Sequence, residues 1–224
     1  MSPRAKLLFG FLLANIAIAV TATLVLLNRP AAPPQIQGVL LPQARTLPNF
    51  RLLDHHNRVF TNEDLKGRWH LVSYGFTTCP DICPTVLSQL AMVKRRLQEQ
   101  DHTDLRVLFY TVDHRRDTVA QMASYVPYFD PGFIGLTHRD DSENPHLPFE
   151  QGLGIVAQRV PATGPNTDPA DNEYEVMHGV TLFLINPQGK LQAIFEPDNN
   201  QTGPQNFNPD TVLQDYLAIR RYLG

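Results

Sequence analysis

Hydrophobic positions divide the chain into one long unbroken run and a series of shorter periodic segments. Residues 7–27 carry no charged side chain, and at about 1.5 Å per helical residue they span roughly 30 Å, the thickness of a bilayer core. Arg4 and Lys6 precede this run, whereas Arg29 is the one basic residue close behind it. The pattern predicts a transmembrane anchor at 7–27, with residues 1–6 in the cytoplasm and the remainder outside.

A cleaved signal peptide is the alternative for the same segment. Its apolar region would usually hold about 7–15 residues and end at a small-residue cleavage site. The run is longer here, and the sequence NRPAAPP that follows it is a poor cleavage site. An uncleaved anchor is therefore favoured, followed by a tether rich in proline and alanine at 28–47 and a folded domain at 48–224.

The domain shows alternating strand and helix periods. Alternation around a polar His-Asn turn at 50–61 predicts a β-hairpin, and residues 161–176 predict a polar insertion or a loose hairpin. The other strands are predicted at 69–76, 105–113, 133–137, 154–160 and 179–195, the last range as a hairpin, and the helices at 85–100, 117–129, 143–154 and 208–223. This order predicts an α/β domain with a mixed central sheet flanked by helices.

Charge and composition narrow the class of partner. The formal net charge is −3, and the basic residues are scattered rather than gathered in a stripe. We therefore expect no nucleic-acid binding.

The two cysteines of the chain, Cys79 and Cys83, stand in GFTTCPDICPTVL between a predicted strand and a predicted helix. A disulfide between cysteines four residues apart closes too short a loop to stabilise the fold appreciably. Pro80 and Pro84 disfavour helical geometry at the cysteines before them, which predicts a tight loop at a helix N-terminus. That position lowers thiol pKa values. Asp81 between them is expected to be a turn or capping residue, with a role toward a bound cation as the alternative.

Two thiolates need a further soft donor to hold a metal, and histidine is the common one. His178 ends the polar insertion and directly precedes a predicted strand, and His114 follows the strand at 105–113. Spacing alone does not select His178. The remaining histidines are predicted to be ordinary surface residues: His55, His56, His70, His102, His138 and His146.

Three stretches, GFTTCPDICP, FYTVDHRRDT and VMHGVTLFLINPQGK, together resemble the Sco/SenC family of membrane-anchored copper proteins, over residues 47–224. The resemblance implies a thioredoxin-like fold and copper, Cu(I) or Cu(II), bound by Cys79, Cys83 and His178. It also implies a role in maturing the CuA centre of cytochrome c oxidase. Asp113 matches a family aspartate near the site, and with Asp81 it is expected beside the ligands or facing a partner. A strand-end aspartate that caps a turn is the competing interpretation of Asp113.

The chain departs from the family pattern at three positions. Thr78 stands where the family often has histidine, Met177 where it often has aspartate, and His114 where it often has proline. None of these removes a ligand. Met177 is expected to pack rather than to bind, because it points away from His178 on an extended segment.

Two classes of function follow from these residues. Thioredoxin-fold dithiol oxidoreductases carry a cis-proline before the late strand, but this chain has Val180 there, and a cis peptide would cost about 2.5–4 kcal/mol. A trans bond is expected, which favours metal binding over general dithiol exchange. The predicted function is a copper chaperone, not an enzyme, with a subsidiary thiol–disulfide role. The alternative is a thiol–disulfide oxidoreductase or a copper or redox sensor.

The predicted setting is a bacterial-type inner membrane, crossed once, with the N-terminus inside and the domain in the periplasm. The predicted partners are the oxidase subunit that carries CuA and an upstream copper donor.

Overall fold

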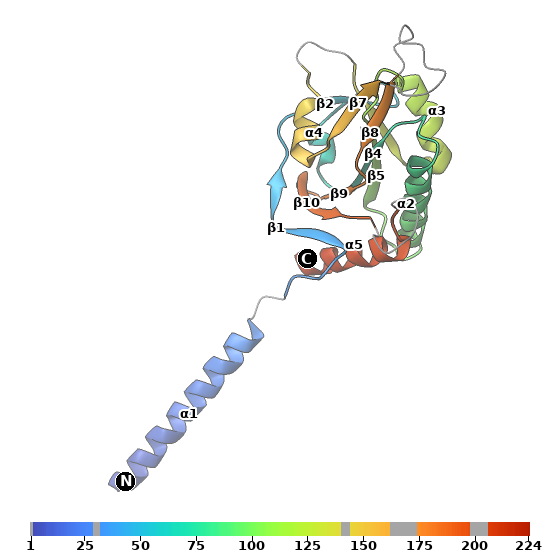
Figure 1. Cartoon of the computed structure of the whole chain (residues 1–224). Coiled ribbons are helices and arrows are strands. Elements are labelled where there is room, and N and C mark those ends of the chain that lie inside the picture. Colours follow the sequence, from blue (N-terminus) through green and yellow to red (C-terminus); the bar gives the residue numbers. More distant parts are fainter. Residues whose placement is uncertain (1, 29–31, 140–143, 162–173, 198–205) are drawn as a thin grey trace. The chain divides into compact units, whose positions relative to one another are not determined.

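The computed structural model describes residues 2–28, 32–139, 144–161, 174–197 and 206–224. The chain separates into two compact units, residues 1–33 and 34–224. The first contains α1 (Pro3–Leu27; Figure 1). An 18-residue stretch of this helix has a mean hydropathy of 2.3, so its length and composition suit a membrane span. A signal sequence near an N-terminus has the same properties, so the helix is a candidate span.

The second unit is a layered α/β domain. Its helices are η1 (Asn62–Leu65, a 3-10 turn), α2 (Ile82–Gln98), α3 (Val119–Phe129), α4 (Leu147–Leu153) and α5 (Pro209–Leu223). Its strands are β1 (Gly38–Thr46), β2 (Arg51–Asp54), β3 (Val59–Thr61), β4 (Trp69–Gly75), β5 (Leu105–Thr111), β6 (Ile134–Thr137), β7 (Ala157–Pro161), β8 (Tyr174–His178), β9 (Leu182–Ile185) and β10 (Lys190–Phe195).

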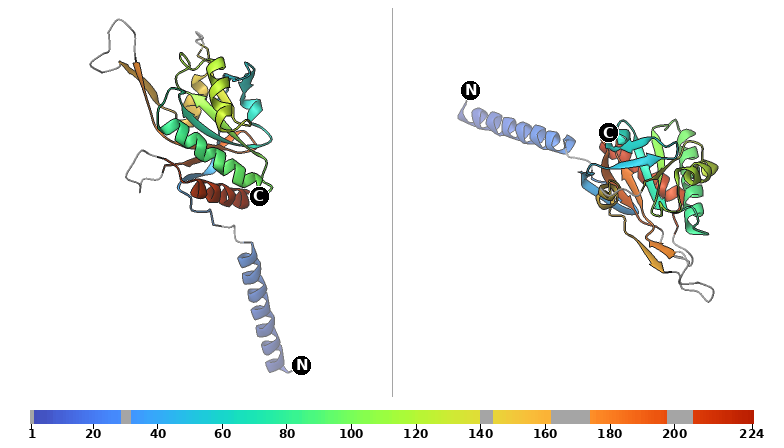
Figure 2. Two further views of the ribbon diagram at one scale, coloured as in Figure 1. Left: turned by 90° about the vertical axis from the view of Figure 1, so that its right-hand side faces the viewer. Right: turned by 90° about the horizontal axis from the view of Figure 1, so that it is seen from above.

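The main sheet has the strand order β1-β10-β9-β4-β5-β6-β2-β3. Strands β4, β5 and β6 run parallel to one another, and the outer pairs are antiparallel, so the sheet is mixed as predicted. Strands β7 and β8 form a separate two-stranded hairpin that extends from the main sheet (Figure 2).

Both faces of the central strands are covered, which explains their unbroken apolar sequences. Every residue of β4 is buried. Leu71 packs into a cluster with apolar residues of α2, α3 and α5, while its neighbour Val72 packs into the opposite cluster with α4 and the β2–β3 hairpin. Helices α2 and α5 lie side by side on the first face (Figure 2).

The structure differs from the sequence prediction in the segment taken as a tether. Residues 38–46 of the predicted 28–47 tether form β1, which pairs antiparallel with β10 from Gly38 opposite Phe195. Leu40 packs against one core cluster and Leu41 against the other. The second half of the segment is therefore part of the sheet, since its apolar side chains reach both layers.

Of the two predictions for residues 161–176, a polar insertion or a loose hairpin, the hairpin is observed at the ends of the segment. Residues 174–176 belong to β8, which pairs with β7 from Ala157 opposite His178 to Pro161 opposite Tyr174. The ends of the insertion thus form a hairpin, while residues 162–173 lie outside the described residues. The remaining predicted strands and helices are observed, with ends shifted by a few residues.

His70 on β4 is fully buried, which makes the stability of the domain depend on pH. Burial, and then the charges of Arg106 and Arg68, lower its pKa from 6.5 to about 4. The unfolded chain therefore binds more protons than the folded chain between these values, and stability is lost as pH falls through this window. We expect urea unfolding to show a shallower decline in stability from pH 6.5 to pH 4 in His70→Leu than in the wild type. An equal decline in both proteins would refute this assignment.

Candidate metal centre

The cysteine segment connects the end of β4 to α2, at the carboxyl edge of the parallel strands. Cys79 lies half-buried in the loop, and Cys83 is buried in the first turn of α2. The prediction that Pro84 keeps Cys83 out of helical geometry is wrong. The restriction before proline is a bias, and the first helical turn tolerates proline because its N–H groups have no intrahelical partner.

Gly75, the last residue of β4, leaves room for the Cys83 sulfur. A Cβ atom at this position would lie 2.5 Å from Cys83 Sγ. The strand can therefore approach the sulfur this closely because residue 75 has no side chain.

The two thiols differ in acidity. Burial raises the pKa of Cys79, but N–H groups of Asp81, Cys83 and Ile82 and the Cys83 thiol donate to its sulfur, and the net effect lowers the pKa. Burial, with the neighbouring Cys79 sulfur, raises the pKa of Cys83 far above its usual value. The Cys79 thiol of the reduced loop therefore ionises more readily than the Cys83 thiol, which donates a hydrogen bond to the Cys79 sulfur.

Asp81 occupies the N-cap position of α2 and is exposed. Its side chain makes no capping hydrogen bond with the described part of the helix, so the expectation of a cap holds for its position alone. Its contribution to the loop is the main-chain N–H that reaches the Cys79 sulfur.

Asp117 fixes the start of the cysteine loop. Its buried carboxylate accepts hydrogen bonds from the Thr77 N–H at 2.8 Å and hydroxyl at 2.6 Å, and from the Thr111 hydroxyl at 2.6 Å. Asp117 directly precedes the N-cap of the following helix and does not cap it. Thr118 caps α3 by accepting from the Gln121 N–H, which leaves the aspartate to tie the loop to β5.

His178 is the last residue of β8, and its half-buried ring lies against two aromatic rings. Its centroid is 5.6 Å from that of Tyr74 and 5.6 Å from that of Phe76. Burial lowers the pKa of His178, so the neutral ring is favoured. Nδ1 donates to the Gly179 carbonyl at 2.7 Å, which leaves the lone pair on Nε2.

Asp113 positions the strand that carries His178. This fully buried carboxylate accepts from the Tyr174 hydroxyl at 2.6 Å and from Arg116 Nε. Arg116 also lies over the rings of Tyr174 at 4.3 Å and Phe76 at 5.9 Å. Tyr174 begins β8 and His178 ends it, so Asp113 anchors that strand beside the cysteine segment.

The predicted ligands border the same three residues, 74–76, but they are not closed into a bonded set. Among the described residues, the group with three ligand atoms all within 4.8 Å of one another is His138, His146 and Glu150. His178 lies against Tyr74 and Phe76, near the cysteine segment. Its ring nitrogens and the two sulfurs are not all within 4.8 Å of one another.

Several other expectations are corrected by burial. Met177 is 62% exposed rather than packed, because alternation along β8 turns it away from the aromatic rings that contact His178.

His55, His70 and His138 are buried rather than ordinary surface residues. His114 lies against His138 instead of the cysteine loop. The peptide bond before Val180 is trans, as expected.

A sequence model of the SCO1/SenC family matches residues 40–205. The chain belongs to this family. The resemblance read from the sequence is thus confirmed.

Individual Sco/SenC relatives agree with this assignment. A Stutzerimonas stutzeri protein whose name provisionally calls it copper-binding is 36% identical over 197 residues, 88% of this chain and 92% of that protein. The mitochondrial SCO2 homologue of Bos taurus is 39% identical over 63% of this chain, and the chain spans half of that protein, 50% of its length.

Solved Sco structures match the fold. Arabidopsis thaliana ScoI, crystallised with copper bound, superposes with a TM-score of 0.62 at 27% identity, over 79% of this chain and 99% of that one. BsSco, described as a member of the Sco family of cytochrome c oxidase assembly proteins, matches at 19% identity and a TM-score of 0.57, over 83% and 98% of the chains. The predicted thioredoxin-like mixed sheet flanked by helices is confirmed, and the copper-bound ScoI structure and the Stutzerimonas stutzeri relative support copper as the metal.

Sequence reasoning missed the residues that fix the cysteine loop and β8. Asp117, Tyr174 and Arg116 make no conspicuous motif with the cysteines. The one available signal is the spacing of Asp113 and Asp117 directly after a buried strand. At this spacing, each carboxylate can accept hydrogen bonds from a different neighbouring segment.

The unequal thiols give a direct test. We expect iodoacetamide at neutral pH to label Cys79 rapidly and to spare Cys83 in the reduced full-length protein, because the thiolate is the reactive form and Cys83 is buried. Peptide mass spectrometry over time measures each rate, and Cys79→Ser should remove the fast phase. Faster labelling of Cys83 would contradict the assignment.

The close approach at Gly75 gives a second test. We expect Gly75→Ala to displace the Cys83 sulfur and weaken metal binding at the cysteines. Thermal unfolding of the variant separates this local effect from loss of the fold. Unchanged metal affinity in a folded variant would show that the sulfur position is not critical.

Proposed function

We propose that this protein is a copper metallochaperone for cytochrome c oxidase, and that Cys79, Cys83 and His178 bind its cargo copper for delivery to the CuA subunit. Sco proteins are linked to assembly of that oxidase. The observation that carries the proposal is that all three residues border residues 74–76: the Cys79 N–H donates to the Phe76 carbonyl at 3.3 Å, Cys83 packs on Gly75, and His178 lies against Tyr74 and Phe76.

The donor chemistry suits copper cargo. Two sulfurs and one imidazole form a soft set of low coordination number, which favours Cu(I) and permits transfer by ligand exchange. Cys79 supplies the first thiolate. Binding at Cys83 must release a proton, because metal ligation requires the thiolate.

His178 completes the set in this proposal. Its neutral ring presents Nε2 as the donor, since Nδ1 is bonded to the Gly179 carbonyl. Copper draws the ring from its position against Tyr74 and Phe76 toward the sulfurs. Asp113 keeps β8 beside the loop during this closure, and exposed Asp81 faces the approaching partner.

A thiol–disulfide role toward the target cysteines is the second candidate, and the unequal thiols favour it. The Cys79 thiolate attacks a target disulfide, forming a mixed disulfide and releasing one target thiolate. Cys83, once deprotonated, attacks the Cys79 sulfur and releases the second target thiolate. The target is reduced and the Cys79–Cys83 pair is oxidised, a form that cannot hold copper.

In the proposed setting α1 remains as an uncleaved anchor, with the N-terminus in the cytoplasm and the domain outside the inner membrane. The upstream copper donor delivers its ion there.

Copper analysis of the reduced full-length protein in detergent tests the ligand set. We expect about one copper per chain, none in Cys83→Ser, and severely weakened binding in His178→Ala. X-ray absorption should report sulfur and nitrogen donors. His56→Ala, which changes an exposed histidine away from the loop, serves as the matched control.

Unchanged copper retention in His178→Ala would remove this histidine from the ligand set. The same variant separates the two candidate functions. Loss of copper transfer with intact disulfide reduction supports the chaperone, whereas equal loss of both points to a redox function.

A further inference from the structure

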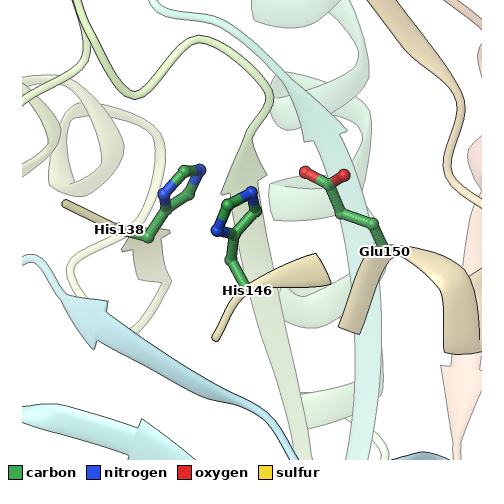
Figure 3. Close-up of side chains that lie close together, drawn as sticks. All are labelled: His138, His146 and Glu150. Carbon is green, nitrogen blue, oxygen red and sulfur yellow. The ribbon is translucent and has the colours of Figure 1, made fainter. Parts of the chain in front are cut away.

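A second cluster of metal-ligand side chains lies apart from the cysteines, between the end of β6 and α4. His138, His146 and Glu150 place three ligand atoms within 4.8 Å of one another (Figure 3). The picture shows the Glu150 carboxylate directed toward the ring of His146, with His138 on the other side of that ring.

The fold fixes these side chains from independent elements. His138 directly follows β6 and is buried, while His146 precedes α4 as its N-cap and Glu150 lies within α4. A spacing of four residues places His146 and Glu150 on one side of the helical turn. The rings of His138 and His146 stack with centroids 3.5 Å apart and planes 8° apart.

Two hydrogen bonds orient the donors. His138 Nδ1 donates to the Arg139 carbonyl at 3.2 Å, so its Nε2 carries the lone pair. The hydroxyl of Tyr110 donates to Glu150 Oε1 at 2.5 Å from a fully buried position on β5. Partners of this kind set the direction and basicity of metal ligands, and the second carboxylate oxygen of Glu150 is left for an ion.

The charges around the cluster include one group that favours a bound cation and two that oppose it. Burial raises the pKa of Glu150, although the Tyr110 hydrogen bond and the charges of His114 and Arg159 oppose this. A bound cation would compensate the cost of a buried carboxylate. Arg115 and Arg159 line the same hollow and oppose a cation, but the Arg159 guanidinium is directed to His114 Nδ1 at 3.1 Å and to the Tyr174 ring at 5.6 Å.

We propose that His138, His146 and Glu150 bind one divalent transition-metal ion, Zn²⁺ or Cu²⁺. Two imidazoles and one carboxylate are a borderline donor set that suits these ions, with remaining positions open to water. Metal–ligand distances of about 2.0–2.2 Å require the two rings to tilt out of their stack. The site differs in chemistry from the sulfur-rich cysteine segment, and it does not depend on the proposed function.

The test uses the full-length protein in detergent with both cysteines replaced, Cys79→Ser and Cys83→Ser, so that sulfur contributes nothing. We expect calorimetric titration to show one equivalent of Zn²⁺ bound. Stoichiometric binding should be lost in His146→Gln and in Glu150→Gln, and retained in the control His56→Gln. Tyr110→Phe, which removes one hydroxyl, should weaken affinity about tenfold or more.

Two further measurements keep the test decisive. Zn²⁺ should raise the thermal midpoint of the cysteine-free protein and leave that of His146→Gln unchanged, which also shows that the variant folds. Cu²⁺ bound to the same protein should show nitrogen hyperfine coupling in its electron paramagnetic resonance spectrum, reduced in His146→Gln. Absence of Zn²⁺ and Cu²⁺ binding in the folded cysteine-free protein, or binding that survives His146→Gln and Glu150→Gln, would overturn the proposal. Failure of copper binding at the cysteines would leave it standing.

Discussion

Two buried carboxylates at the end of β5 hold together the parts of the proposed copper site. Asp117 accepts three hydrogen bonds from Thr77 and Thr111 and fixes the cysteine loop, while Asp113 accepts from Tyr174 and Arg116 and fixes β8. Burying such groups is costly unless every charge is compensated. The cysteine loop and β8, about a hundred residues apart in sequence, are thus both tied to this one turn.

The unequal thiols and the neutral imidazole give the site a defined resting chemistry. Cys79 ionises more readily than Cys83, whose pKa is raised by burial, and Nδ1 of His178 is bonded to the Gly179 carbonyl, which leaves the lone pair on Nε2. Under the proposed function, copper loading and disulfide exchange both begin at the Cys79 sulfur. In that proposal, the redox state of the cysteine pair decides which of the two reactions can occur.

Sequence periodicity predicted most of the fold, because strands buried on both faces and amphipathic helices leave local patterns. It could not predict β1, whose pairing with β10 is not local and whose proline-rich surroundings resemble a linker. At the site, the family resemblance supplied the candidates Cys79, Cys83 and His178. The roles of Asp117 and Tyr174 depend on contacts across the fold, and the burial of His138 depends on how β6 meets α4, so neither could be read from local sequence.

The pairing of β1 with β10 also sets an order of events during synthesis. Residue 38 leaves the ribosome long before its neighbour at residue 195, and contacts this distant in sequence form late. Until β10 has been synthesised, β1 and β9 lack the strand that lies between them. Cys79 and Cys83 are already part of the chain at that stage. The newborn chain thus passes through a stage at which the cysteine segment has been synthesised but the sheet is still incomplete.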